Sequence, residues 1–265
     1  MDIKKFDELN FSDDFMFYKV MTNYEDICRR VVELCIGHKV SGIRYKGGQE
    51  TMKVTPQGRG IRLDVYLEDD KNTIYDLEMQ TVTDRDTGRR VRYYDSVMSV
   101  NSLESGKRFR ELPDSYIVFI CLFDPFGQGR AVYEFRKRDK TDHKLQLDDG
   151  SVDILINVYG DDSECSPEMR QFLSAVRGNA NASGIGRDIN NAVQEVKEHR
   201  QWREDYMLYE IKLMEHEEIG EAKRDRELIE RWTMEGKSAE EISGLLARPL
   251  NEITDVIAAL DRSCR

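Results

Sequence analysis

Two neighbouring segments, residues 62–67 and 73–80, alternate apolar with polar residues, and this period of two is typical of β-strands. The segment between them is rich in turn-forming residues, so the two strands are expected to form a hairpin. The alternation places Asp64 of the first strand and Glu78 of the second on the same polar face. Two carboxylates brought together in this way can hold a hard divalent cation. The hairpin is therefore the first candidate for a functional site.

Helical and strand patterns alternate on either side of this hairpin. A helix is predicted over residues 11–36, with Ser12 as its N-cap and Gly37 at its end. A second helix is predicted over 89–108, and residues 116–123 are apolar throughout, as in a central strand covered on both faces. Further strands are expected over 40–45, within 50–55, over 130–136 and over 153–158. This order predicts an α/β fold with a buried central strand.

The C-terminal part of the chain has a helical pattern from about residue 166. A long charged helix is predicted over 190–235, interrupted at Gly220, and two apolar stripes follow it in a helix–turn–helix arrangement. Residues 225–265 carry nine acidic and six basic residues, so a structural or partner-binding tail is favoured over a DNA-reading one. We therefore expect three parts: a core over 1–160, a helical extension over 161–224 and a small helical tail over 225–265.

Cysteine and histidine usage excludes several kinds of chemistry. The five cysteines show no CxxC spacing and the four histidines no HxxH or HxxxH spacing, so neither a zinc site nor a histidine-based nucleophile is supported. No apolar run is long enough for a membrane span, and the N-terminus lacks the apolar core of a signal peptide. The expected location is the cytoplasm with no membrane partner, and carboxylate and metal chemistry is the main catalytic option.

The net charge of −11 is unusual for a protein that binds DNA. A nuclease with a net negative charge can still bind DNA if its basic residues are confined to one cleft. Two segments, Arg85–Arg92 and Arg130–Lys140, are candidates for the lining of such a cleft. For the second segment, ordinary solvated charge is an equally good interpretation.

Four short segments occur in an order that points to a known family. They are Ser12–Phe17, Glu78–Gln80, Arg90–Tyr94 and Phe119–Gly127. Together with Asp64, they resemble the recombination-promoting nuclease and transposase family of the PD-(D/E)xK superfamily, over about residues 6–219. The resemblance implies a restriction-endonuclease-like core of order αβββαβ, with a mixed sheet flanked by helices and a helical C-terminal extension.

The resemblance also implies roles for individual residues. Asp64, Glu78 and the backbone carbonyl of Met79 would hold the metal, which is expected to be Mg²⁺ or Mn²⁺. Gln80 stands where the commonest pattern of the superfamily has a lysine, and glutamine can orient water but carries no charge. Arg90 or Arg92, in the following helix, could supply the missing positive charge by reaching into the cleft, and Arg90 is the one we select as catalytic.

Further residues belong to this predicted site with less support. Asp14 matches the acidic residue of the family's first helix, which would complete the metal shell or a network of waters. The alternative is an ordinary first-turn acid that favours the helix dipole. Arg89, Arg92 and Tyr93 are expected to contact DNA. Asp76 lies on the same strand face as Glu78, but two residues away, and we rank it below the other carboxylates.

These features predict a metal-dependent endonuclease that hydrolyses DNA with low sequence specificity, linked by the resemblance to recombination or mobile elements in a bacterium. The alternative is a catalytically inactive nuclease-fold protein that binds DNA or a partner, and the acidic balance and Gln80 favour it. The sequence does not separate RNA from DNA as the substrate. A homodimer through the C-terminal helices is also expected.

Overall fold

The computed structural model describes residues 4–47, 51–52, 60–83 and 85–263. Contacts between residues divide the chain into two compact units, residues 2–202 and 203–265. The part of the chain from α4 to α5 lies in the first unit, where these helices contact α1 and α2. The boundaries expected at residues 160 and 224 stay predictions.

A six-stranded mixed sheet forms the centre of the first unit, with strand order β1-β4-β5-β6-β8-β7. Its strands are β1 (Arg44–Gly47), β4 (Val65–Glu68), β5 (Ile74–Gln80), β6 (Ser115–Cys121), β7 (Val132–Phe135) and β8 (Ser151–Asn157). Strands β4 and β5 form the antiparallel hairpin that the alternation predicted, and β5, β6 and β8 run parallel to one another. Two further short strands, β2 (Thr51–Met52) and β3 (Ile61–Arg62), pair separately.

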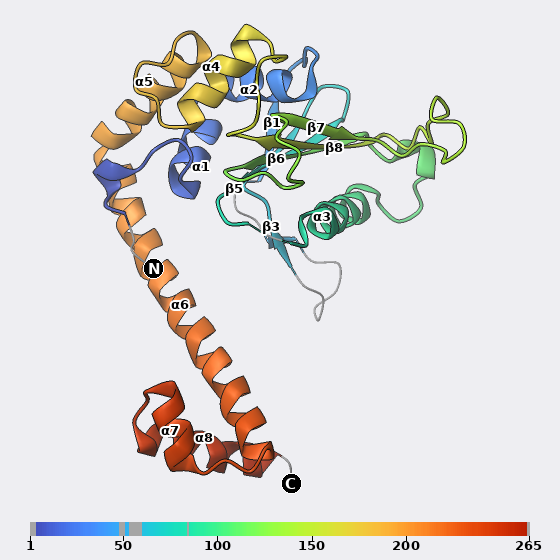
Figure 1. Cartoon of the computed structure of the whole chain (residues 1–265). Helices are drawn as coiled ribbons and strands as arrows, with labels where there is room; N and C mark the ends of the chain where they lie inside the picture. The colour runs from blue at the N-terminus through green and yellow to red at the C-terminus, as the bar shows by residue number, and fades with distance from the viewer. Residues whose placement is uncertain (1–3, 48–50, 53–59, 84, 264–265) are drawn as a thin grey trace. The chain divides into compact units, whose positions relative to one another are not determined.

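Helices cover both faces of this sheet. They are α1 (Asp14–Asn23), α2 (Glu25–Ile36), α3 (Thr87–Ser102), α4 (Pro167–Val176) and α5 (Ile185–Glu198), with short 3₁₀ turns at Phe6–Glu8 and Phe109–Glu111. Figure 1 shows α3 on one side of the sheet and α2, α4 and α5 on the other. This arrangement is the α/β fold, with a mixed sheet flanked by helices, that the sequence predicted.

Covering both faces buries the central strands completely. All residues of β5 are buried, and β6 is buried except for a partly exposed Tyr116. The core on the α3 side contains Ile117 and Phe119 of β6 together with Val91 and Met98 of α3. The polar residues of β5 face this same side, because they alternate with its apolar ones. They therefore lie beneath α3 instead of facing solvent.

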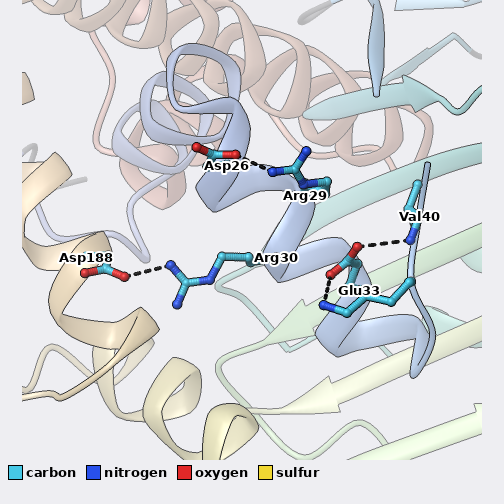
Figure 2. A network of polar contacts seen from close by, with 7 residues as sticks. Asp26, Arg29, Arg30, Glu33, Val40 and Asp188 are labelled. Carbon is cyan, nitrogen blue, oxygen red and sulfur yellow. Dashed lines mark hydrogen bonds and ion pairs between the residues drawn. The ribbon is translucent and has the colours of Figure 1, made fainter. Parts of the chain in front are cut away.

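A network of polar contacts holds α2 in place (Figure 2). Arg30 Nη1 donates to Asp188 Oδ2 of α5 at 2.7 Å. Glu33 accepts from the Val40 backbone N–H at 3.0 Å and from Lys39 Nζ at 2.7 Å. Gly37 ends the helix in the left-handed conformation (φ 79°), which a glycine adopts without steric cost. These contacts fix the direction in which the chain leaves α2 toward β1.

Several predicted element boundaries are wrong. The N-cap of the first helix is Asp13 instead of Ser12, and the strand expected over 40–45 begins only at Arg44. The helix expected over 11–36 is two helices, because Tyr24 leaves the helical conformation and its hydroxyl donates to Glu195 of α5 at 2.9 Å. The helix expected over 89–108 ends at Ser102. The first strand of the hairpin begins at Val65, so Asp64 lies in a bend between β3 and β4. The strand expected within 50–55 is described only at β2, and its other positions lie outside the described residues.

The second unit contains most of α6 (Arg200–Met234), with α7 (Ala239–Leu246) and α8 (Leu250–Ser263). Ile229, Ile242 and Ile253 form its buried centre, one from each helix. A capping box begins α7, since Ser238 and Glu241 exchange hydrogen bonds between side chain and backbone. The predicted break at Gly220 is wrong, because α6 continues through it. Within the described part of the chain, no helix combines the length and apolar character needed to cross a bilayer.

Candidate active site

Backbone N–H groups hold the carboxylates of Asp64 and Glu78. The Asp64 N–H donates to Glu78 Oε1 at 2.8 Å, and the Met79 N–H donates to Asp64 Oδ2 at 3.1 Å. Within a strand the N–H and C=O of one residue point to the same side, so the Met79 carbonyl also faces Asp64. The structure therefore brings together the two carboxylates and the carbonyl that the sequence analysis selected.

Gln80 and Arg90 extend this set of contacts toward α3. Arg90 Nη1 donates to Gln80 Oε1 at 2.6 Å, and Gln80 Nε2 lies 3.5 Å from Glu78 Oε2. The guanidinium group of Arg90 lies 5.6 Å from the centre of the Phe119 ring and 5.8 Å from that of Tyr94. These distances suit cation–π contacts. The side chain that replaces the usual lysine thus has a positive charge beside it.

Burial and neighbouring carboxylates make the acids of this site hard to ionise. Burial and the charge of Asp14 raise the pKa of Asp64 to about 7. The Met79 N–H, Arg62 and Arg90 act in the opposite direction. A carboxyl group with this pKa is divided between its protonated and charged forms at neutral pH. It can therefore exchange its proton for a cation under physiological conditions.

Asp76 and Glu78 are still less able to carry charge. Burial, then the charges of Asp76 and Asp64, raise the pKa of Glu78 well above its usual range. Burial and the charge of Asp64 do the same for Asp76, which is fully buried and whose two carboxylate oxygens have no hydrogen-bond partner. We ranked Asp76 low, and only its place on the β5 face could have indicated that it belongs to this cluster. Such a cluster of buried acids requires protons or a cation.

Asp14 is a first-turn acid whose charge acts on the site, and its role in the metal shell stays a prediction. It is the first residue of α1, the position where an acidic side chain favours the helix dipole. Its charge also acts on Asp64, and burial raises its own pKa. Asp14 therefore belongs to the electrostatic environment of the site.

The residues expected to contact DNA lie on another face of α3. Arg89 is exposed and pairs with Asp86 at 3.2 Å, Arg92 is exposed, and Tyr93 is 37% exposed. Arg89, Arg92 and Tyr93 follow the spacing i, i+3, i+4 and so share one face of the helix. Arg90 lies on the inner face and reaches the carboxylates. The sequence alone did not show which of these arginines points inward.

The donors of the site suit a hard cation. Oxygen atoms from Asp64, Glu78 and the Met79 backbone are the ligands that Mg²⁺ and Mn²⁺ prefer. Among the described residues, no three histidine, cysteine or acidic side chains converge in a metal-binding arrangement. Mg²⁺ does not require such a cage, because it keeps several waters and is commonly bound through one or two carboxylates. The residues present therefore fit a cation whose remaining ligands are water and substrate.

The sheet order, the α3 crossover between the parallel strands β5 and β6, and the acids of the β4–β5 hairpin define a nuclease-type α/β fold. The family model described as PD-(D/E)XK nuclease family transposase matches residues 14–149. The chain belongs to this family, as the resemblance implied, and membership indicates a nuclease or mobile-element function. A comparison with curated proteins gives no match, and neither does a comparison with solved structures.

Proposed function

We propose that this protein is a divalent-metal-dependent endonuclease that hydrolyses DNA phosphodiester bonds with low sequence specificity, in recombination or the movement of mobile elements. The backbone bonds that hold the Asp64 and Glu78 carboxylates carry this proposal. Glu78 accepts from the Asp64 N–H and Asp64 accepts from the Met79 N–H, so their oxygens are positioned before any ligand arrives. A surface hairpin with a merely solvated polar face has no need of this arrangement.

Asp64, Glu78 and the Met79 carbonyl would hold Mg²⁺ or Mn²⁺. The bound cation would lower the pKa of water and offset negative charge on the phosphate. The carboxylates contribute by giving up their protons, since only their charged forms are strong ligands. The pKa of Asp64, raised to about 7, indicates that this proton is lost readily near neutral pH.

Gln80 and Arg90 together would replace the lysine of the commonest superfamily pattern, Gln80 by orienting water and Arg90 by its positive charge. The Gln80 amide can orient water through hydrogen bonds, and Arg90 fixes that amide by donating to its oxygen. The guanidinium group supplies the charge that glutamine lacks. In this position it would stabilise negative charge that develops on the phosphate as the bond breaks.

Metal-dependent cleavage of supercoiled plasmid tests the proposal. With Mg²⁺ or Mn²⁺ the purified protein should nick the plasmid, and EDTA should abolish nicking, because the acids cannot activate water without a cation. Calorimetry in the absence of DNA should show cation binding. If neither metal supports cleavage and calorimetry detects no binding, the nuclease proposal is wrong, and a nuclease-fold binding module becomes the better account.

Replacing Arg90 should impair cleavage specifically. We expect Arg90→Ala to lower kcat roughly 10²- to 10³-fold, the usual effect of removing one group that stabilises transition-state charge. Arg187→Ala is the matched control, because Arg187 is an exposed arginine of α5 outside the site, and its rate should stay within about twofold of wild type. Single-turnover plasmid cleavage measures both variants. Equal rates for the two would remove Arg90 from the site.

The remaining assignments follow from this proposal. Arg89, Arg92 and Tyr93 form an outer face of α3 that would contact the DNA backbone. Homodimerisation through the C-terminal helices remains a prediction, and sedimentation of the full chain would test it.

A further inference from the structure

A cluster of three aromatic rings and an arginine lies on the sheet face that carries the acids. Phe126, Phe135 and Arg130 are exposed, and Tyr133 is buried. Phe126 follows β6, and Tyr133 and Phe135 lie on the edge strand β7. The centre of the Phe126 ring is 4.9 Å from that of Tyr133 and 5.1 Å from that of Phe135. The guanidinium group of Arg130 lies over the Tyr133 ring at 5.1 Å. We call these four residues the aromatic platform.

Strand register connects the aromatic platform to the proposed active site. Glu78 pairs with Phe119, Phe119 with Leu155, and Leu155 with Tyr133, so one row crosses the sheet from the acids to the platform. Three strand spacings separate the ends of this row, on the order of 14 Å. Arg90 lies over Phe119 and Arg130 over Tyr133, so a guanidinium group stands over two of the rings in the row.

The loop that carries Phe126 is held in one shape by Asp124. Its carboxylate accepts from the N–H of Phe126 at 3.1 Å, the N–H of Gly129 at 2.6 Å and the hydroxyl of Tyr133 at 3.0 Å. The Tyr133 hydroxyl in turn accepts from the Arg130 N–H at 3.1 Å. These bonds position the platform in advance, so a ligand that binds there does not have to order it.

Exposure and charge indicate what the platform binds. Phe126 is 38% exposed and Phe135 is 45% exposed. Residues 130–138 contain four basic residues and one acidic residue, a local net charge of +3 in a chain whose net charge is −11. Exposed rings among arginines are the arrangement that binds single-stranded nucleic acid, since bases stack on the rings and cations contact the phosphates. A base-paired duplex keeps its bases stacked inside and cannot use the rings.

We infer that the aromatic platform binds unpaired bases of the DNA strand beside the cleavage site. This inference rests on the proposed nuclease function and specifies its substrate class, DNA with a single-stranded segment such as a flap, gap or melted end. Unpaired bases stacked on the exposed rings of Phe126 and Phe135 would hold the strand at the β7 edge of the sheet, on the order of 14 Å from Glu78.

Fluorescence anisotropy of labelled oligonucleotides in EDTA tests the platform without cleavage. The full-length protein should bind a single strand more tightly than a duplex of the same length. Phe126→Ala should weaken single-strand binding roughly 5- to 150-fold, the effect of losing one stacked base, and leave duplex binding unchanged. Phe126→Leu keeps an apolar contact with Tyr133 but has no ring, so it should show most of the same loss. Arg130→Ala should also make the plot of log affinity against log salt concentration less steep, by the slope of about one phosphate contact.

Phe109→Ala is the matched control, because Phe109 is 87% exposed but lies outside the platform. Its affinity should stay within about twofold of wild type. Unchanged single-strand affinity in Phe126→Ala and Arg130→Ala, or equal losses for single strand and duplex, would overturn the platform. If the protein cleaves plasmid but binds single strands no more tightly than duplex, the inference about the aromatic platform is wrong and the nuclease function stands. Single-strand binding that depends on Phe126, in a protein that cleaves nothing with metal, would support the platform and contradict the nuclease function.

Discussion

Asp64→Asn and Glu78→Gln should each lower the rate of plasmid cleavage by about 10³-fold or more, because each removes a charged ligand that the cation requires. The amides have nearly the same shape as the acids, and the asparagine oxygen can still accept from the Met79 N–H. The fold should therefore survive while the chemistry is lost. Single-turnover cleavage and calorimetry with Mn²⁺ measure the two effects, and we expect cation binding to weaken in parallel with the rate.

Glu104→Gln is a suitable control for these variants, since Glu104 is an exposed carboxylate in the turn after α3. Its cleavage rate should match that of wild type. Full cleavage by both Asp64→Asn and Glu78→Gln would mean that the site is wrongly placed or that the activity belongs to a contaminant. Circular dichroism would confirm that each variant keeps the wild-type secondary structure.

Asp76→Asn should make the protein more stable, and the gain should grow as the pH rises. Burial and the charge of Asp64 raise the pKa of Asp76 well above its usual range, so the folded protein holds a proton that the unfolded chain releases. Below the ordinary pKa of an aspartate both states are protonated, and Asp76 costs nothing through this effect. Above it, the free energy of unfolding of the wild type falls by about 1.4 kcal/mol per pH unit, until the folded pKa is reached. Because asparagine does not titrate, the free energy of unfolding of Asp76→Asn does not fall with pH through this effect.

Urea denaturation from about pH 4 to about pH 7 measures the difference between wild type and Asp76→Asn. Burying the asparagine amide has its own cost, but that cost is independent of pH, so the slope of the difference is the decisive observation. Glu104→Gln again serves as the control and should follow the wild-type curve. A difference that stays constant with pH would show that Asp76 does not hold a proton in the folded protein.

Local patterns were sufficient for the elements that form the site. Alternation in 62–67 and 73–80 predicted the β4–β5 hairpin, which the structure contains. Asp64 lies in the bend before β4, where its N–H still donates to Glu78. The apolar run over 116–123 predicted the buried strand β6. These predictions succeed because a side chain's direction along a strand is set by the strand's own period of two.

The failed predictions concern the places where helices break. Nothing in the sequence around Tyr24 requires a break, but its contact with Glu195 of α5 stabilises one. Gly220 favours a break locally, yet one glycine costs a helix only about 1 kcal/mol, and α6 continues through it. The chain breaks instead at His199, whose ring stacks on that of Trp202 with centres 4.2 Å apart.

The amino-acid pattern was thus enough to identify the carboxylate pair and the strands that carry it. It could not show that α3 covers Asp76, Glu78 and Gln80, or that Arg90 is the arginine that reaches them. Direction along a strand or helix follows from the geometry of that element. Burial, ionisation and partners depend on which other element packs over it, and α3 meets the sheet only through contacts between segments that are separate in the chain.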